Sequence, residues 1–89
     1  MDTPAHPGGS AIIVRVLFFG PLAESIGERE VEIALSKDTK LIDLISRLNL
    51  EDLVSKGLRV ALDGNIYSDF EIPLKDHSEV AFLPPVSGG

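Results

Sequence analysis

The residues of this chain best suited to chemistry are its last two, Gly88 and Gly89. Glycine has no Cβ, so both residues can pass through a narrow channel, and the carboxylate of Gly89 is as unhindered as a peptide allows. Such a carboxylate suits activation and transfer inside another protein's pocket. The same pair is also compatible with an ordinary frayed end, because glycine is common at chain termini. The neighbouring residues must decide between the two interpretations.

The segment before the diglycine favours delivery of the carboxylate. Pro84 and Pro85 fix φ and remove two N–H donors, so strand pairing should end there and the chain should leave the body as a short arm. We therefore predict Gly89 as the reacting group. The residues expected to form the flexible diglycine tail are Val86, Ser87, Gly88 and Gly89.

Composition limits the chemistry that the chain can perform by itself. It contains no cysteine, which excludes disulfides, thiolate metal sites and a thiol nucleophile. If this protein handles sulfur, a partner must supply it. His6 and His77 are far apart and lie in expected surface segments, so they do not indicate zinc. We predict no metal and no cofactor bound by this chain.

Length and charge limit the class of protein. Eighty-nine residues suffice for one small domain with a modest core. The net charge of −6 argues against nucleic acid and favours a positively charged protein surface as partner. No stretch approaches the roughly 18 apolar residues that span a bilayer, and the first ten residues do not resemble a signal peptide. No membrane partner is expected, and the predicted location is cytoplasmic.

The first half of the chain predicts two strands after a flexible start. Residues 1–11 are rich in proline and glycine and are expected to form a flexible extension, with the folded domain spanning 12–85. The apolar run 12–19 predicts a central strand, and 21–26 fits one helical turn that begins with a proline. Residues 29–35 alternate, which indicates a half-buried strand.

The second half predicts the main helix and the rest of the sheet. Thr39 is expected to cap this helix. Its apolar residues recur at helical spacing, at Leu41, Leu44, Ile45 and Leu48. A further turn is expected at 50–54, followed by strands at 59–62, 66–67 and 79–83, with a tight hairpin at 63–65. The order predicts an α+β domain in which one long helix covers one face of a mixed sheet, with the first and last strands side by side.

The uncovered face of that sheet is expected to carry a patch near the tail. Strand alternation puts Arg15 and Glu79 on the outer face of the first and last strands. Four apolar residues share that face: Leu17, Phe19, Ala81 and Leu83. A patch of this kind usually binds a protein partner, and with Pro84 and Pro85 it forms our predicted partner interface. The alternative is that loops such as 21–27 cover these side chains.

Two blocks of sequence resemble a known family. The end of the chain, Glu79-Val80-Ala81-Phe82-Leu83-Pro84-Pro85-Val86-Ser87-Gly88-Gly89, is similar to the terminal signature of the small subunit of molybdopterin synthase, a ubiquitin-like β-grasp sulfur carrier. The start, with Val16-Leu17-Phe18-Phe19-Gly20 and then Gly27-Glu28-Arg29-Glu30, is a second matching block. The resemblance covers most of the chain and implies a β-grasp fold.

A few residues depart from the family pattern at turns. Asp76-His77-Ser78-Glu79 stands where the family often has Asp-Gly-Asp-Glu, so His77 is expected to adopt a positive φ. Lys40 replaces a frequent threonine at the start of the main helix, and Thr39 is expected to cap it instead.

The resemblance also implies a mechanism and partners. An E1-like activating enzyme would use ATP to adenylate Gly89, and sulfur from a donor protein would convert it to a thiocarboxylate. The tail would then enter the large subunit of molybdopterin synthase, within a heterotetramer, and donate sulfur to cyclic pyranopterin monophosphate during molybdenum cofactor biosynthesis. The chain itself would be a carrier, with the catalytic side chains on its partner.

Three other functions stay open on the sequence. A ubiquitin-like modifier would use the same activation but join Gly89 to a lysine. A carrier for thiamine thiazole or tRNA thiolation would pass its sulfur to a different acceptor. A plain interaction domain would have an inert end.

Overall fold

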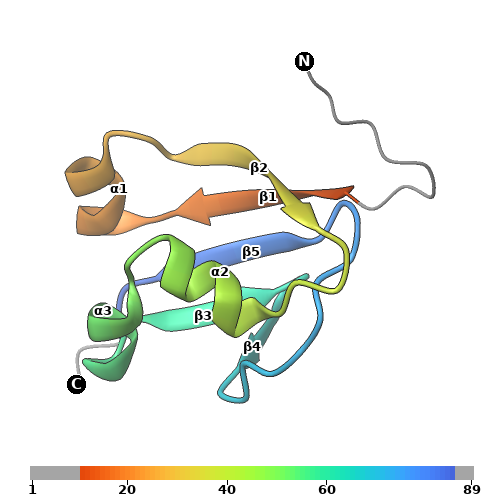
Figure 1. Cartoon of the computed structure of the whole chain (residues 1–89). Coiled ribbons are helices and arrows are strands. Elements are labelled where there is room, and N and C mark those ends of the chain that lie inside the picture. Colours follow the sequence, from red (N-terminus) through yellow and green to blue (C-terminus); the bar gives the residue numbers. More distant parts are fainter. Residues whose placement is uncertain (1–10, 86–89) are drawn as a thin grey trace.

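The computed structural model describes residues 11–85, which form a five-stranded sheet with three short helices (Figure 1). The predicted extension and the predicted tail 86–89 lie outside these residues, apart from residue 11. The elements in chain order are β1 (Ala11–Phe18), α1 (Gly20–Ile26), β2 (Glu30–Ser36), α2 (Leu41–Arg47), α3 (Glu51–Ser55), β3 (Arg59–Leu62), β4 (Asn65–Tyr67) and β5 (Glu79–Leu83).

The sheet is mixed, with the strand order β2-β1-β5-β3-β4. β1 runs parallel to β5, and the other neighbouring pairs are antiparallel. The prediction that the first and last strands lie side by side is therefore confirmed. Because they run parallel, Phe18 lies beside Phe82, so the chain enters α1 at the same end of the sheet from which it leaves β5.

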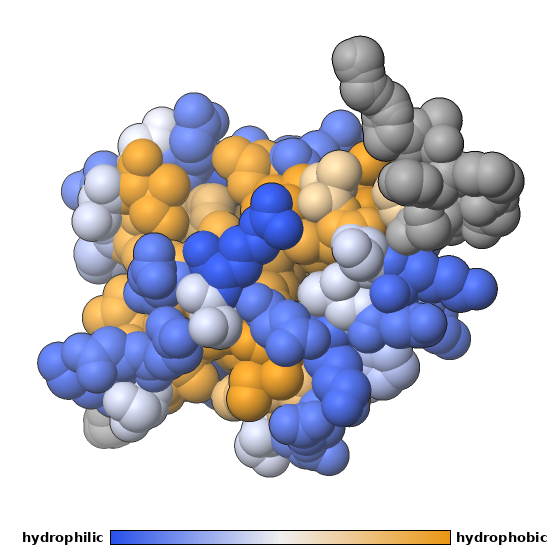
Figure 2. Space-filling model, in the orientation of Figure 1, coloured by the Kyte–Doolittle hydropathy of each residue, from blue (hydrophilic) through white to orange (hydrophobic). Residues whose placement is uncertain are grey.

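The core lies between the sheet and α2 with α3. Every second residue of β1, from Ile12 to Phe18, is buried, as are Val80 and Phe82 of β5. These side chains form one cluster with Leu41, Leu44 and Ile45 of α2. Figure 1 shows both helices on one face of the sheet, and Figure 2 shows the molecule from the same side, with hydrophilic side chains interrupted by apolar strips. The predicted inner and outer sets of β1 are confirmed.

The strand boundaries follow the sequence pattern closely. β3 and β5 have the predicted bounds, while β1 and β2 are each displaced by one residue. Ala11, which the sequence placed in the extension, pairs with Ser36. The hairpin after β3 turns through Asp63 and Gly64, with φ values of 49° and 89°. His77 adopts the expected positive φ, at 67°.

The helical region differs from the prediction in length. Instead of one long helix, α2 ends at Arg47 and α3 begins at Glu51. Asn49, with φ of 59°, lies between them in the left-handed region and interrupts the helical path. Leu48 still contacts the core, so the predicted apolar stripe is correct although the helix that carries it is shorter.

The predicted capping role of Thr39 is wrong. Its hydroxyl donates a hydrogen bond to the Ser36 carbonyl at 2.7 Å, back toward β2. Lys40 occupies the N-cap position, and its N–H donates to the Asp43 carboxylate at 2.9 Å. Residues Leu41 and Ile42 donate their N–H groups to carbonyls of the 68–74 loop, at Ile72 and Phe70. The helix start is thus satisfied by a distant loop, which local sequence does not reveal.

The same loop is tied to α2 by an ion pair. The Lys40 ammonium donates a hydrogen bond to the Glu71 carboxylate at 3.0 Å, and this bond together with the Glu71 charge raises the pKa of Lys40 above its ordinary 10.5. Among residues 11–85, no helix is long and apolar enough to cross a membrane.

Candidate functional site

The outer face of the sheet carries an apolar row that crosses four strands. Leu17 of β1 lies beside Ala81 of β5, Ala81 lies beside Ala61 of β3, and Ala61 lies beside Ile66 of β4. Leu17 and Ala81 are half-buried, whereas Ile66 is 48% exposed. Ala61, in the middle of the row, is buried, and larger apolar side chains lie at its two ends.

The end of this face nearest to the tail is also apolar. Leu83, the last residue of β5, is half-buried, and Phe19, one residue past β1, is 43% exposed. We call Leu17, Phe19, Ala81 and Leu83 the outer patch. All four side chains keep some exposure, although residues of the 21–27 segment line a hollow together with Leu17 and Phe19.

Charged residues border the outer patch on its other side. Arg15 of β1 lies 3.2 Å from a carboxylate oxygen of Glu30 on β2 and 3.4 Å from one of Glu79 on β5. These exposed ion pairs connect three adjacent strands across the outer face. Pairs of this type contribute little stability, and here they separate the apolar end of the face from Ile13, which is exposed further back along β1.

Pro84 and Pro85 begin the exit toward the tail and rest against two glycines. A Cβ built on Gly20, the first residue of α1, would lie 3.5 Å from Cγ of Pro84. A Cβ built on Gly57, just after α3, would lie 3.2 Å from Cβ of Pro85. Both prolines are exposed on their other sides. The base of the tail therefore lies in contact with two helical elements.

Two hollows adjoin this exit, and Phe19 borders both. The first has a volume of about 400 Å³ and lies between α1, α3 and the two prolines, with Leu22, Leu53 and Leu58 in its lining. The second, of about 640 Å³, lies between α1 and the end of β1, where Leu17 meets three carboxylates: Glu24, Glu28 and Glu30. Phe19 thus lies at the edge of the outer patch beside Pro84 and Pro85, in a surface where apolar side chains meet charged ones, including Lys56 and Arg29.

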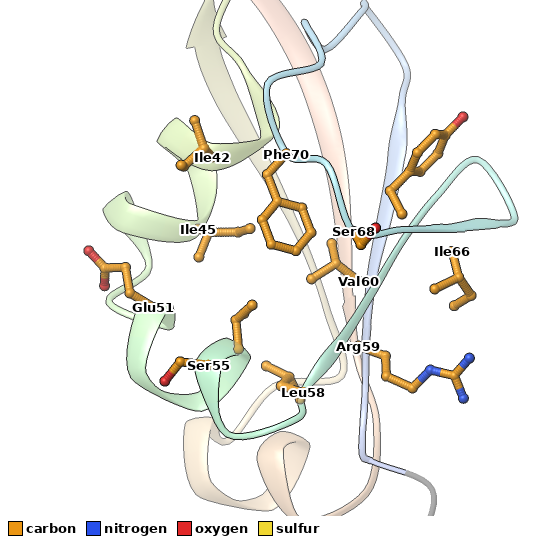
Figure 3. A pocket seen from close by; sticks show the side chains of 12 residues that line it. Ile42, Ile45, Glu51, Ser55, Leu58, Arg59, Val60, Ile66, Ser68 and Phe70 are labelled. Atoms are coloured by element: carbon orange, nitrogen blue, oxygen red, sulfur yellow. The ribbon is translucent and has the colours of Figure 1, made fainter.

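A third hollow shares Leu58 with the first. Its volume is about 590 Å³, and Figure 3 shows Ile45, Phe70 and Leu58 around the space between the helices and β3. Arg59 and Ile66 lie on the other side of β3 in this view. None of the predicted site residues lines this hollow.

The structure brings the described members of the predicted site together at one end of the sheet. The outer patch, Pro84 and Pro85 are contiguous through strand pairing and chain connectivity. The reacting residue Gly89 and the tail residues Val86, Ser87 and Gly88 lie outside the described residues. Within residues 11–85, no three His, Cys, Asp or Glu side chains are grouped as metal ligands would be. The predicted absence of metal and cofactor stays a prediction.

Sequence reasoning missed two residues at this site. The residue pattern around Gly20 and Gly57 gives neither of them a role at this site. Each indeed ends or begins an element, but each also contacts a proline far away in sequence. A positive φ accompanies both contacts, 61° at Gly20 and 117° at Gly57, and no sequence signal identifies the partner prolines.

Solved structures resemble this fold over most of its length. The solution structure of HVO 2177 from Haloferax volcanii superimposes with a TM-score of 0.76 at 20% identity, covering 100% of this chain and 97% of the other. A chain in the complex of subunits 1 and 2 of the molybdopterin-converting factor from Helicobacter pylori gives 0.64 at 32% identity, covering 88% of this chain and 100% of that one. Small archaeal modifier protein 1 from Methanosarcina acetivorans gives 0.66 at 26% identity, covering 91% and 100%.

Sequence comparison agrees with these structures. The molybdopterin synthase sulfur carrier subunit of Escherichia coli is 32% identical over 87 residues, which cover 86% of this chain and 100% of the relative. The ThiS family model matches residues 16–89.

Together, the mixed sheet with its parallel central strands and these neighbours define a ubiquitin-like β-grasp protein. The chain belongs to the ThiS family, and it is a homologue of the molybdopterin synthase sulfur carrier subunit.

Proposed function

We propose that this chain is the sulfur carrier subunit of a molybdopterin synthase, acting in the cytoplasm, with Gly89 as the residue that bears sulfur. The single observation that carries the proposal is the match to the E. coli sulfur carrier subunit, which extends over the full length of that relative. The match of the ThiS family model through residue 89 supports the role of Gly88 and Gly89 in particular.

The chemistry of a carboxylate determines the order of events. A carboxylate resists nucleophiles, so Gly89 first attacks the α-phosphorus of ATP on an E1-like activating enzyme, which releases pyrophosphate and leaves an acyl-adenylate. A persulfide sulfur of a donor protein then attacks the acyl carbon, and AMP leaves. Cleavage of the resulting acyl disulfide by a thiol releases the Gly89 thiocarboxylate. Since this chain contains no cysteine, both sulfur reagents come from partners.

The outer patch is the proposed contact with the large subunit. It is apolar, partly exposed and adjacent to Pro84 and Pro85, so a partner that binds it lies next to the point where the chain leaves the sheet. The H. pylori neighbour was solved as a complex of two subunits, which supports a two-subunit assembly here. Inside a heterotetramer with two copies of each subunit, the thiocarboxylate donates sulfur to cyclic pyranopterin monophosphate.

Intact mass spectrometry tests the loading step. The chain is incubated with ATP, a cognate activating enzyme and a persulfide donor, beside a matched chain that lacks Gly89. We expect the full chain to gain the mass difference between sulfur and oxygen and the truncated chain to stay unchanged. An unchanged mass for the full chain, in a mixture that loads a control carrier, would contradict the proposal.

A second candidate function is protein modification. The similarity to small archaeal modifier protein 1 from M. acetivorans, at 26% identity, favours it. In that case the activated Gly89 forms an isopeptide bond with a lysine of another protein. Adducts that retain the chain's C-terminal peptide on lysines of co-purified proteins would support this function.

A further inference from the structure

Two glycines contact the base of the tail from two different elements. Gly20 opens α1 and faces the ring of Pro84, with an added Cβ 3.5, 3.9 and 4.0 Å from three of its ring carbons. Gly57 follows α3 and faces Pro85, at 3.2 and 3.8 Å. Each glycine lies far from its proline in the sequence, so the contacts exist only in the folded domain.

Gly57 provides the tighter of the two contacts. A Cβ at 3.2 Å from the Pro85 ring is closer than the roughly 3.5–4.0 Å at which carbon atoms rest, so a side chain would push the ring away. The backbone around Gly57 is held by hydrogen bonds from Gly57 to the Val54 carbonyl at 3.1 Å and from Leu58 to the Leu53 carbonyl at 2.9 Å. Gly57 therefore cannot retreat without breaking the end of α3.

Because each proline ring is part of the backbone, a contact that holds the ring also limits the conformation of the chain at that point. Each proline fixes its own φ, and each restricts the residue before it to extended conformations. Between the end of β5 at Leu83 and the residue after Pro85, few torsions remain free. Holding the two rings in place thus fixes the position and orientation of Pro85, the point from which the chain continues.

We propose that Gly20 and Gly57 are positioning residues: by seating Pro84 and Pro85 they set the direction in which residues 86–89 leave the domain. This inference rests on the proposed function for its purpose, which is to present Gly89 to the activating enzyme and to the large subunit. We call the contact of Gly20 and Gly57 with the two proline rings the seat, and it can be measured without either partner.

A distance measurement tests the seat directly. Because the chain has no cysteine, spin labels can be placed at Lys37→Cys on the body and Val86→Cys after the prolines. We expect Gly57→Ala to shift or broaden the distance distribution between the labels. Gly64→Ala is the matched control, because Gly64 also has a left-handed φ, 89°, but has no atom within 4 Å of an added Cβ. Equal distributions in Gly57→Ala and the parent would overturn the seat, as would an equal change in Gly64→Ala.

A second set of variants decides the question even if Gly57→Ala does not fold. Pro85→Gly removes the ring and leaves Gly57 unchanged, so it should broaden the same distribution. If Gly57 acts through Pro85, the double variant should be no broader than Pro85→Gly alone. Additive broadening would contradict the coupling. Gly20→Ala should have a smaller effect than Gly57→Ala, because its added Cβ makes an ordinary contact.

The functional readout is the rate of thiocarboxylate formation at low activating enzyme. We expect Gly57→Ala to lower kcat/KM by roughly ten- to hundredfold through misplacement of the reacting group, and Gly64→Ala to match the parent. Equal rates for all three would overturn the positioning role. If the parent chain itself is not loaded, the proposed function fails, while the label distances still decide whether the seat exists.

Discussion

The two faces of β1 and β5 differ in what covers them. On the inner face, Val16 and Phe82 are fully buried against α2, and the rings of Phe18 and Phe82 stack with centroids 6.0 Å apart. On the outer face, Leu17 and Leu83 belong to the same strands but are only partly buried. One set of apolar residues therefore stabilises the fold, and the other remains available for a partner. Strand alternation separates the two sets at each step along the chain.

Substitutions at adjacent positions of β5 should separate the faces most clearly. Phe82→Ala should lower the free energy of unfolding by about 3–5 kcal/mol, because it removes a fully buried ring and leaves a cavity. Leu83→Ala, one residue further on, should cost less than about 1.5 kcal/mol because its side chain is only partly buried. Urea unfolding measures both values. Similar losses at the two positions would mean that the faces are not distinct.

A charge on the outer patch should affect binding more than folding. Phe19→Asp or Leu83→Asp should weaken binding to the large subunit by at least about tenfold, roughly 1.4 kcal/mol, while the domain stays folded. Ile13→Asp is the control, because Ile13 is 39% exposed on the outer face of β1 but lies beyond Arg15, away from the tail. Calorimetric titration measures the affinities. If all three variants bound as the parent does, the patch would not be the interface.

Substitutions at the start of α2 should lower the stability of the domain and leave its affinity for the large subunit unchanged. Asp43→Ala removes the acceptor of the Lys40 N–H at the helix start and should cost about 1 kcal/mol of stability. Asp43→Asn keeps an acceptor and should recover most of this loss. The affinity for the large subunit should not change in either variant, which thermal melts and titrations together can check. A loss of affinity would extend the interface beyond the outer face.

The smallest expected effect is the pH dependence of the ion pair between Lys40, at the start of α2, and Glu71 in the 68–74 loop. Because Glu71 raises the pKa of Lys40, this pair stabilises the fold below pH 10.5, and its contribution is lost as the pH rises through the raised pKa. The stability difference between the parent and Lys40→Met should be present at neutral pH and disappear in strong alkali. Since both side chains are exposed, the difference should be slight and salt-sensitive. A difference that persisted in alkali would exclude the ion pair as its cause.

Local patterns in the sequence predict most of the sheet. β3 and β5 have the expected bounds, because apolar runs there are limited by turn residues such as Asp63 and Gly64. The pairing of β1 with β5 follows because both are the most apolar strands and occupy the centre. The outer patch was predicted for the same reason, since side-chain alternation needs no knowledge of distant contacts.

The parts that sequence reasoning missed depend on distant contacts. Thr39 has the right type for a cap, but the N–H groups after it find loop carbonyls some thirty residues later, at Phe70 and Ile72. In the sequence, Gly20 and Gly57 are typical of the ends of helices and strands. Only the fold brings Pro84 and Pro85 against them. The residues around the tail exit therefore required the structure, while Gly89 was indicated by the diglycine, by the prolines that precede the tail and by family resemblance.

Transfer of sulfur from the loaded chain tests the central claim most directly. The thiocarboxylated chain is mixed with the large subunit and cyclic pyranopterin monophosphate, and both proteins and the pterin are followed by mass spectrometry. We predict that the chain returns to its carboxylate mass as molybdopterin forms, with two carriers consumed for the two sulfurs of each dithiolene. A chain that keeps its sulfur, or that ends attached to a lysine, would contradict the account.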